Sequence, residues 1–297
     1  MNIKAWIEAA RLRTLPLAIA NMSMGNGLAA IDGKFSWSIC LLSIWTAVSL
    51  QILSNLANDY GDSIHGADSA ERKGPIRAVQ SGILSSSQMK NAMILWSIIA
   101  LISGITLIWI AIDALLLQIL FLLLGIGAIW AAINYTAGSK PYGYSGKGDI
   151  SVFVFFGLVS ILGCYYLQTG TFQWMIILPA ISCGALSVGV LNVNNIRDIH
   201  SDGLAGKRSI PIKIGRNAAV RYHGALLAIA ILSVLIYTTI NYIRPIQYLF
   251  LTIIPILTMH FIKVKNTQDA IALDPYLKQL ALSTAVFVAL FLIGNLA

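Results

Sequence analysis

Long apolar stretches dominate the chain and constrain its fold more than any other feature. A stretch of about 20 apolar residues is long enough to cross the hydrocarbon core of a bilayer as a helix. Nine such stretches, separated by short polar segments, lie near residues 14–31, 37–57, 91–111, 114–134, 150–168, 173–193, 220–240, 245–264 and 276–296. Only 11% of the 297 residues are charged, whereas a soluble domain has about 25%. The sequence therefore predicts an all-α membrane protein with about nine transmembrane helices.

Basic residues are divided unevenly between the two sides that this helix count defines. The formal net charge of +8 would suggest nucleic acid as the partner of a soluble protein, but in a membrane protein Lys and Arg mainly mark cytoplasmic loops. With nine spans, 18 of the 20 Lys and Arg residues fall on the side of the N-terminus, and only Lys34 and Arg244 fall on the other. We therefore expect the lipid bilayer, and no nucleic acid, as the partner, with the N-terminus cytoplasmic and the C-terminus outside.

The two longest polar segments, about 58–90 and 194–222, resemble each other. Each contains an Asn followed four residues later by an Asp, and then a basic pair: Asn58, Asp62 and Arg72-Lys73 in the first, and Asn194, Asp198 and Lys207-Arg208 in the second. The motifs end the second and sixth spans, which run in the same direction, and this matched position favours a repeat over a chance likeness. We expect a single domain, 1–297, with halves at about 1–140 and 141–265 and a final helix at about 276–296, around a central cavity.

Carboxylate and amide side chains recur at helical spacing in both motifs. The first places Asn55, Asn58, Asp59 and Asp62 close together on a helix, and the second places Asn194, Asp198 and Asp202 on one stripe. Carboxylates at the edge of a membrane are costly unless they are paired or bind a cation. Oxygen ligands without His or Cys at ligand spacing favour Mg²⁺, which also accepts phosphate oxygens as ligands. The sequence therefore predicts a Mg²⁺ site that binds a diphosphate.

Basic residues beside the motifs support a diphosphate substrate, because Arg and Lys pair with phosphate oxygens. They are Arg72, Lys73, Arg77, Lys207 and Arg208, and any one of them can equally be an ordinary cytoplasmic loop charge. A diphosphate with a tail that needs a membrane cavity is a polyprenyl diphosphate. Loss of its diphosphate promotes an allylic cation that an electron-rich aromatic ring attacks.

These motifs resemble the paired signature of the UbiA superfamily of intramembrane prenyltransferases. The superfamily likeness is carried by Asn58-Asp59-x-x-Asp62 and Asp198-x-x-x-Asp202. Four runs together resemble its menaquinone branch, and the resemblance covers nearly the whole chain. They are Arg11-Leu12-Arg13-Thr14-Leu15-Pro16, Asn58-Asp59-Tyr60-Gly61-Asp62, Asn194-Asn195-x-Arg197-Asp198 and Gly206-Lys207-Arg208. The resemblance implies nine helices around a lateral cavity in a bacterial inner membrane. The implied reaction transfers a polyprenyl group from its diphosphate to 1,4-dihydroxy-2-naphthoate, releasing diphosphate and CO₂ and giving demethylmenaquinone.

The resemblance also implies roles for single residues. The Mg²⁺ and diphosphate site would be Asn58, Asp62, Asp198 and Asp202, with Asp59 among the catalytic carboxylates and Asn194 close by. The diphosphate contacts would be Arg13, Arg72, Lys73, Lys207 and Arg208. The superfamily often places another Asp where this chain has Gly66, so Asp68, two residues later, is a further candidate metal ligand.

The connection over residues 135–149 is rich in Gly and Tyr and resembles a segment that lies over the cavity in the same superfamily. Lys140, Tyr142 and Tyr144 would then contact the aromatic acceptor or form a lid, although Gly and Tyr are also common in any connection at a membrane interface. His65 and His200 each lie beside an Asp motif and are either candidate bases or structural residues.

Three alternatives remain open at the level of sequence. The acceptor could be 4-hydroxybenzoate, or the prenylated molecule could be haem. A transporter is also built as a repeated helical bundle with internal charges, but carriers hold their binding charges near the midplane, whereas these acids are expected at cytoplasmic helix ends. A scaffold without catalysis would have little use for two clusters of costly carboxylates.

Overall fold

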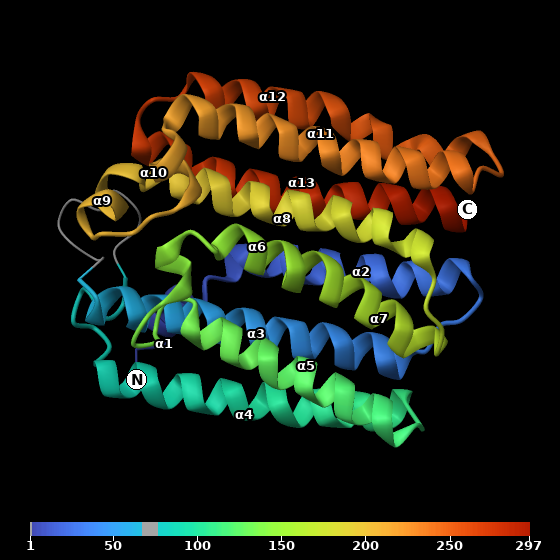
Figure 1. The fold of residues 1–297 in the computed structure, drawn as a ribbon, viewed down its shortest axis with the longest axis horizontal. Helices are drawn as coiled ribbons and strands as arrows, with labels where there is room; N and C mark the ends of the chain where they lie inside the picture. Colours follow the sequence, from blue (N-terminus) through green and yellow to red (C-terminus); the bar gives the residue numbers. More distant parts are fainter. Residues whose placement is uncertain (1, 67–76) are drawn as a thin grey trace.

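Long helices run side by side along the length of the molecule (Figure 1). The structure is a computed structural model that describes residues 2–66 and 77–297. Its long helices are α2 (Leu15–Ile31), α3 (Trp37–Ile64), α4 (Ser86–Ala111), α5 (Leu115–Asn134), α8 (Ile177–Arg197), α11 (Arg216–Ile240) and α13 (Ala270–Leu296). Two further helical stretches are composite. One joins α6 (Gly148–Val152), a π-helical segment (Phe153–Val159) and α7 (Ser160–Thr169), and the other joins a 3₁₀ segment (Pro245–Ile253) to α12 (Ile254–Asn266).

Short helices lie at one end of this bundle. They are α1 (Ile3–Ala10), α9 (Ile199–Leu204) and α10 (Ile210–Ile214), together with short 3₁₀ turns at Leu12–Thr14 and Tyr142–Ser145. The C-terminus lies at the opposite end (Figure 1). The chain therefore begins and ends at opposite ends of the bundle, as an odd number of crossings requires.

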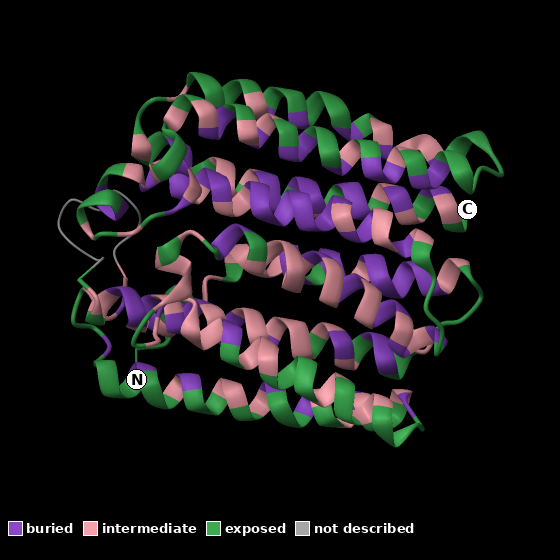
Figure 2. Ribbon diagram, viewed as in Figure 1, coloured by how far each residue is buried: buried purple, intermediate pink, exposed green. Residues whose placement is uncertain are grey.

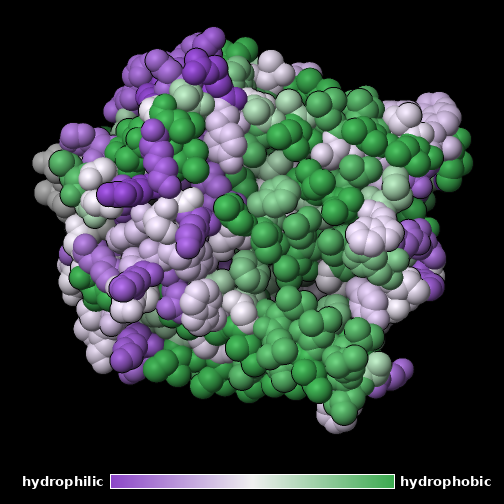
Figure 3. Space-filling view, viewed as in Figure 1, coloured by the Kyte–Doolittle hydropathy of each residue, from purple (hydrophilic) through white to green (hydrophobic). Residues whose placement is uncertain are grey.

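Eight helical stretches of the described residues are long and apolar enough to cross a membrane. The remaining expected span corresponds to α2, which has 17 residues and runs alongside the others. The all-α fold class is therefore confirmed, and the prediction of about nine spans is close. Side chains on the face shown in Figure 3 form an apolar zone over the middle of the bundle, while hydrophilic residues gather at the end that carries α9 and α10. This is the surface of a multi-pass membrane protein.

The two motif-bearing helices extend further than their apolar stretches predict. Helix α3 continues to Ile64 rather than ending near 57, and α8 continues to Arg197 rather than ending near 193. Hydropathy falls where the polar motif residues begin, but these residues face inward and the backbone remains helical. The acids of both motifs are thus held on or directly beside rigid helices at the same end of the bundle.

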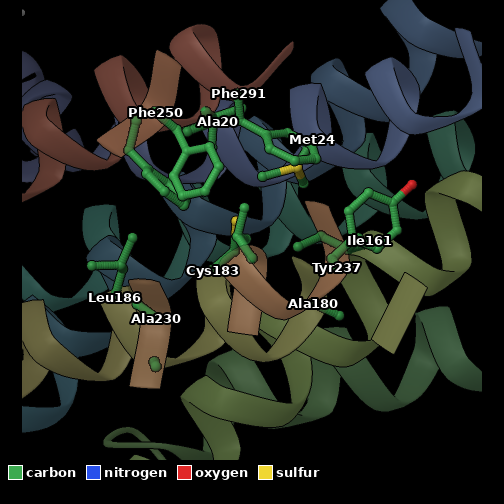
Figure 4. Close-up of a cluster of buried hydrophobic side chains, with 14 of the residues drawn as sticks. Ala20, Met24, Ile161, Ala180, Cys183, Leu186, Ala230, Tyr237, Phe250 and Phe291 are labelled. Atoms are coloured by element: carbon green, nitrogen blue, oxygen red, sulfur yellow. The ribbon is translucent and has the colours of Figure 1, made fainter. Parts of the chain in front are cut away.

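Burial is concentrated on α8, α3 and the helices around them, whereas α4, α5 and α12 are largely exposed (Figure 2). Helix α8 packs against α11 and α13, while α2 packs against α3, α7 and α13. Apolar side chains from α2, α7, α8, α11, α13 and the 3₁₀ segment before α12 form the main core (Figure 4), in which Met24, Cys183, Leu186, Phe250 and Phe291 are buried. The exposed apolar helices therefore face lipid, the main core holds α8, and a second cluster packs α3 against α1 and α4.

The π-helical segment approaches α8 unusually closely. A Cβ atom at Gly157 would lie 2.7 Å from the Cα atom of Gly184, so only glycine fits at this crossing. Small residues allow membrane helices to pack at short range. This contact fixes the stretch that follows the connection over residues 135–149, which closes the motif end of the molecule.

Candidate active site

A cavity of about 780 Å³ runs inside the bundle. At the end that carries α9 it is lined by polar residues of both motifs: Asn58, Asp62, Asn194, Asp198, Asp202 and Lys207. Toward the opposite end of the bundle its walls are apolar and include Leu117, Phe121, Leu167 and Phe172. A cavity with a charged head and a long apolar body fits a ligand that has a charged head and an apolar tail.

Acids from the two motifs meet at the head of this cavity. The Nζ atom of Lys207 lies 3.1 Å from Asp62 Oδ1 and 3.0 Å from Asp202 Oδ1. Asp62 is 3% exposed and Asp202 is 6% exposed, so this ammonium joins two buried carboxylates from distant parts of the chain. Burial raises the pKa of Asp202 above its ordinary value, although the charge of Lys207 opposes the shift. The predicted meeting of the two motifs is therefore present in the structure.

Asp198 is held by a buried arginine. Arg197 donates from Nε to Asp198 Oδ1 at 2.8 Å and from Nη2 to Asp198 Oδ2 at 2.6 Å. The same guanidinium pairs with Asp274 of α13, and Asp274 Oδ2 accepts from Arg13 at 2.7 Å. Such bidentate pairing fixes both the position and the orientation of a carboxylate. The result is a chain of alternating charges that joins α8, α13 and the turn before α2.

Arg77 completes the pairing of Asp62. Its guanidinium pairs with the carboxylate of Asp62 and donates to the backbone carbonyl of Asn58 at 2.7 Å. The side-chain oxygen of Asn58 accepts from Thr136 at 2.9 Å, and that of Asn194 accepts from Arg197 at 2.9 Å. Both Asn residues line the cavity and thus lie where the sequence predicted them.

Asp59 does not line the cavity, although the sequence grouped it with the catalytic carboxylates. It is 2% exposed, and its carboxylate accepts hydrogen bonds from the backbone N–H groups of Ala78 and Val79 at 3.2 and 3.3 Å. Its neighbour Asp62 lies nearly one helical turn further on and faces the cavity. In the structure Asp59 therefore anchors the segment that presents Arg77.

The other basic residues predicted from the sequence differ in whether they line the cavity. Arg13 and Lys207 line the cavity, whereas Arg208 and Lys140 have exposed side chains that do not. The backbone N–H of Arg208 donates to the carbonyl oxygen of Tyr144 at 2.7 Å, so its main chain contacts the Tyr-rich connection. Arg72, Lys73 and Asp68 lie outside the described residues.

The Tyr-rich connection covers the polar head of the cavity. The Tyr144 hydroxyl donates to Asp62, and Lys207 Nζ lies 4.7 Å from the centre of the Tyr144 ring. The Tyr142 hydroxyl lies 2.9 Å from the Ala131 carbonyl oxygen and 2.8 Å from Ser151 Oγ. Burial, together with the charge of Asp62, raises the pKa of Tyr144 well above its ordinary value, so the phenol stays protonated and donates. Both tyrosines line the cavity and both hydroxyls already have partners.

The two histidines beside the motifs lie outside the cavity wall. The His65 ring lies 3.0 Å from the carbonyl oxygen of Gly138, and because a carbonyl only accepts, the ring donates. His200 is exposed, and neither residue lines the cavity. Their positions favour the structural interpretation, with His65 bracing the Tyr-rich connection.

The donor set at the cavity head fits a hard divalent cation. Within the described ranges, no group of three or more His, Cys, Asp or Glu residues is arranged to hold a metal ion by itself. One ammonium nevertheless lies within 3.1 Å of both Asp62 and Asp202, so a single small cation can reach carboxylates of both motifs. Mg²⁺ commonly takes one or two carboxylates and fills its other positions with water and substrate phosphates. The residues therefore fit a metal that binds together with a diphosphate.

The fold and this site together define an intramembrane prenyltransferase. The family model described as "UbiA prenyltransferase family" matches residues 18–293, and the chain belongs to that family. It is 41% identical over 291 residues to the 1,4-dihydroxy-2-naphthoate octaprenyltransferase of Escherichia coli, covering 98% of this chain and 94% of the relative. It is 43% identical over 297 residues to the protein of the same name from Haemophilus influenzae, covering 99% and 96%.

Solved structures of the same fold are similar over nearly the whole chain. The apo structure of a UbiA homologue from Aeropyrum pernix has a TM-score of 0.70 at 16% identity, covering 97% of this chain and 99% of that one. The structure of a UbiA homologue from Archaeoglobus fulgidus bound to GPP and Mg²⁺ has a TM-score of 0.66 at 14% identity, covering 99% and 100%. At these identities the likeness establishes the shared fold.

The sequence did not predict that Arg197 forms ion pairs with Asp198 and Asp274. Arg197 was counted only as a cytoplasmic loop charge and as part of the family motif, yet it is 4% exposed. Asp274 lies just before the last expected span and was not singled out. The sequence did contain a signal: Asp274 is an acidic residue near the start of the final apolar stretch, and the second motif contains a basic residue, Arg197, that could pair with it.

We expect Arg197 and Asp274 to be energetically coupled, because removing the buried guanidinium of Arg197 leaves the charges of Asp198 and Asp274 uncompensated. Arg197→Met should lower the free energy of unfolding by about 3 kcal/mol, measured from thermal unfolding in detergent. The double variant with Asp274→Asn should lose less than the sum of the two single variants. Arg221→Met, at an exposed position, serves as the control and should change little. Strictly additive losses would show that the pair is not coupled.

Proposed function

We propose that this protein transfers a polyprenyl group from its diphosphate to 1,4-dihydroxy-2-naphthoate, releasing diphosphate and CO₂ and giving demethylmenaquinol, the hydroquinone form of demethylmenaquinone. The observation that carries the proposal is the contact of one ammonium, that of Lys207, with acids of both motifs at the head of an apolar cavity. The acceptor is taken from the relatives, which are named as 1,4-dihydroxy-2-naphthoate octaprenyltransferases over nearly the full length of the chain.

In this proposal, residues of both motifs hold the diphosphate and its metal. Asn58, Asp62, Asp198 and Asp202 would be the Mg²⁺ ligands. When bound, Mg²⁺ would neutralise the charge that develops on the leaving diphosphate. Lys207 and Arg77, which pair with the acids in the structure, would pair with phosphate oxygens instead, assisted by Arg13. For Arg72, Lys73 and Arg208 the contact with diphosphate is proposed from the family motif alone.

The reaction needs a dry chamber for an allylic cation. The bond between the first prenyl carbon and the diphosphate oxygen breaks, and the electron pair leaves with the diphosphate. The apolar wall and the cover formed by Tyr142 and Tyr144 exclude water that would otherwise trap the cation. The ring carbon that bears the carboxylate forms the new carbon–carbon bond, and loss of that carboxylate as CO₂ returns an electron pair to the ring.

Acceptor identity is tested by incubating the purified protein with one labelled polyprenyl diphosphate and each candidate acceptor. We expect a prenylated product with 1,4-dihydroxy-2-naphthoate and none with 4-hydroxybenzoate. With an acceptor labelled in its carboxylate, we expect labelled CO₂ to be released in an amount equal to the product formed. Product formed only with 4-hydroxybenzoate would refute the assignment, and uptake of a solute without any product would favour the transporter alternative.

The metal site is tested by diphosphate release. We expect Asp62→Asn and Asp198→Asn each to lower the rate by about 100-fold or more, because electrostatic stabilisation of a developing charge is lost. Chelation of divalent cations should stop release by the unaltered protein, and added Mg²⁺ should restore it. Asp113→Asn, an exposed residue between α4 and α5, is the matched control. Full release by both Asp62→Asn and Asp198→Asn would rule out the proposed metal site.

We further propose that the protein lies in the bacterial inner membrane with the N-terminus and the acidic motifs in the cytoplasm. This orientation rests on the Lys and Arg residues, 18 of 20 of which lie in segments assigned to one side. A phosphatase that folds only outside the cytoplasm should be active when fused to the C-terminus and inactive when inserted at Gly203, an exposed position in α9. Activity at Gly203 and inactivity at the C-terminus would show that the orientation is the opposite of the one proposed.

A further inference from the structure

Two carboxamide oxygens on the cavity wall have no hydrogen-bond partner among the described residues. They are Oδ1 of Asn21 on α2 and Oε1 of Gln51 on α3. Asn21 is 1% exposed, and both oxygen atoms are shielded from solvent. Buried polar atoms in proteins almost always have partners, and exceptions commonly mark a functional site. A ligand of the cavity is therefore the natural partner for these two oxygens.

The orientation of the Asn21 amide is fixed by its neighbours. The Ser187 hydroxyl donates its single hydrogen to the carbonyl oxygen of Cys183 at 2.8 Å. Ser187 can therefore only accept from Asn21, whose Nδ2 lies 3.2 Å from the Ser187 oxygen. Because the amide nitrogen must face Ser187, the amide oxygen is the atom that remains without a partner.

The orientation of the Gln51 amide follows from a second network. The Thr14 hydroxyl donates to the carbonyl oxygen of Arg11 at 2.9 Å, and Asn55 Nδ2 donates to the carbonyl oxygen of Ala10 at 2.9 Å. The Thr14 oxygen and Asn55 Oδ1 are thus left as acceptors, and each accepts from Gln51 Nε2 at 3.3 Å. The Gln51 nitrogen is fully used, so its oxygen too is a fixed acceptor.

These two acceptors lie at matched depths below the acids. Gln51 precedes Asp62 by eleven residues, and Ser187, which orients Asn21, precedes Asp198 by eleven residues. At 1.5 Å per helical residue, each separation is about 16 Å along the helix axis. That interval leaves room for a diphosphate, the first prenyl carbon and an aromatic ring, in this order. The acceptor ring must lie there because its attacking carbon must approach the first prenyl carbon to about 3.5 Å.

We propose that Asn21 and Gln51 bind the aromatic acceptor, each amide oxygen accepting a hydrogen bond from a phenolic hydroxyl. The proposal rests on the proposed function and assigns its acceptor site. Two fixed acceptors select a dihydroxylated ring over a monohydroxylated one, because the missing hydroxyl would leave an oxygen unpaired. The Ser160 hydroxyl is a further buried group of a cavity-lining residue that has no partner among the described residues.

Steady-state kinetics of Asn21→Leu and Gln51→Met test the assignment. Each variant keeps side-chain size and removes the acceptor oxygen together with the amide nitrogen that orients it, so the KM for 1,4-dihydroxy-2-naphthoate should rise about tenfold. The KM for polyprenyl diphosphate should not change. Thr238→Val is the matched control, because the Thr238 hydroxyl is also buried without a partner among the described residues but does not line the cavity. Its KM values should equal those of the unaltered protein.

A ligand series on the unaltered protein decides the question even when a variant fails to fold. Naphthoates that lack one hydroxyl should inhibit about tenfold more weakly than a dihydroxylated inhibitor, and this difference should shrink in the variant that lacks the matching oxygen. Equal inhibition by both ligand types, or an equal rise of both KM values in the variants, would overturn the assignment. Failure of the proposed function is distinct, because the unaltered protein would then form no product with the dihydroxynaphthoate.

Discussion

The structure depends on the electrostatic cost of placing carboxylates at the buried head of an apolar cavity. Asp62, Asp198 and Asp202 are each at most 6% exposed, and charges in such surroundings require compensation. The chain supplies it with Arg77, Arg197 and Lys207, each in direct contact with an acid. Because these cations come from different segments, the same contacts also tie the motif end of the bundle together.

The pairing is of two kinds, and the difference matters for function. Arg197 is rigidly fixed, since it contacts Asp198 through two nitrogens and Asp274 through a third. Lys207 is a single flexible ammonium shared by two acids, and lysine changes partners more readily than a bidentate arginine. Asp62 and Asp202 can therefore exchange the Lys207 ammonium for another cation, while Asp62 stays paired with Arg77 and Asp198 keeps its orientation. A site that must bind and release a diphosphate in every cycle needs both properties.

Sequence predicted the fold and the location of the site well, because both follow from patterns that one chain displays. The apolar stretches place the helices, and the Asn58–Asp62 and Asn194–Asp198 spacings place the acids at one end of the bundle, where the structure brings them together. The division into two halves stays a prediction. Sequence could not separate Asp59 from Asp62, because both are acids in one motif and only the path of residues 77–79 shows that Asp59 binds backbone N–H groups.

The sequence also could not single out Asn21 and Gln51 as the proposed binding residues of the aromatic acceptor. The reason applies to polar residues in membrane helices generally. Asn21 and Gln51 sit within apolar stretches and carry no motif, so their types alone permit bridging, packing or binding. Asn26 illustrates the bridging case, since its amide contacts Ser43 and Gln168 and no atom of it is left over for a ligand. What distinguishes Asn21 and Gln51 is the direction of the hydrogen bonds made by their neighbours, which fixes the position of each amide nitrogen and leaves each oxygen unpaired. Hydrogen-bond direction is set by several helices at once, and it becomes visible only when those helices are packed.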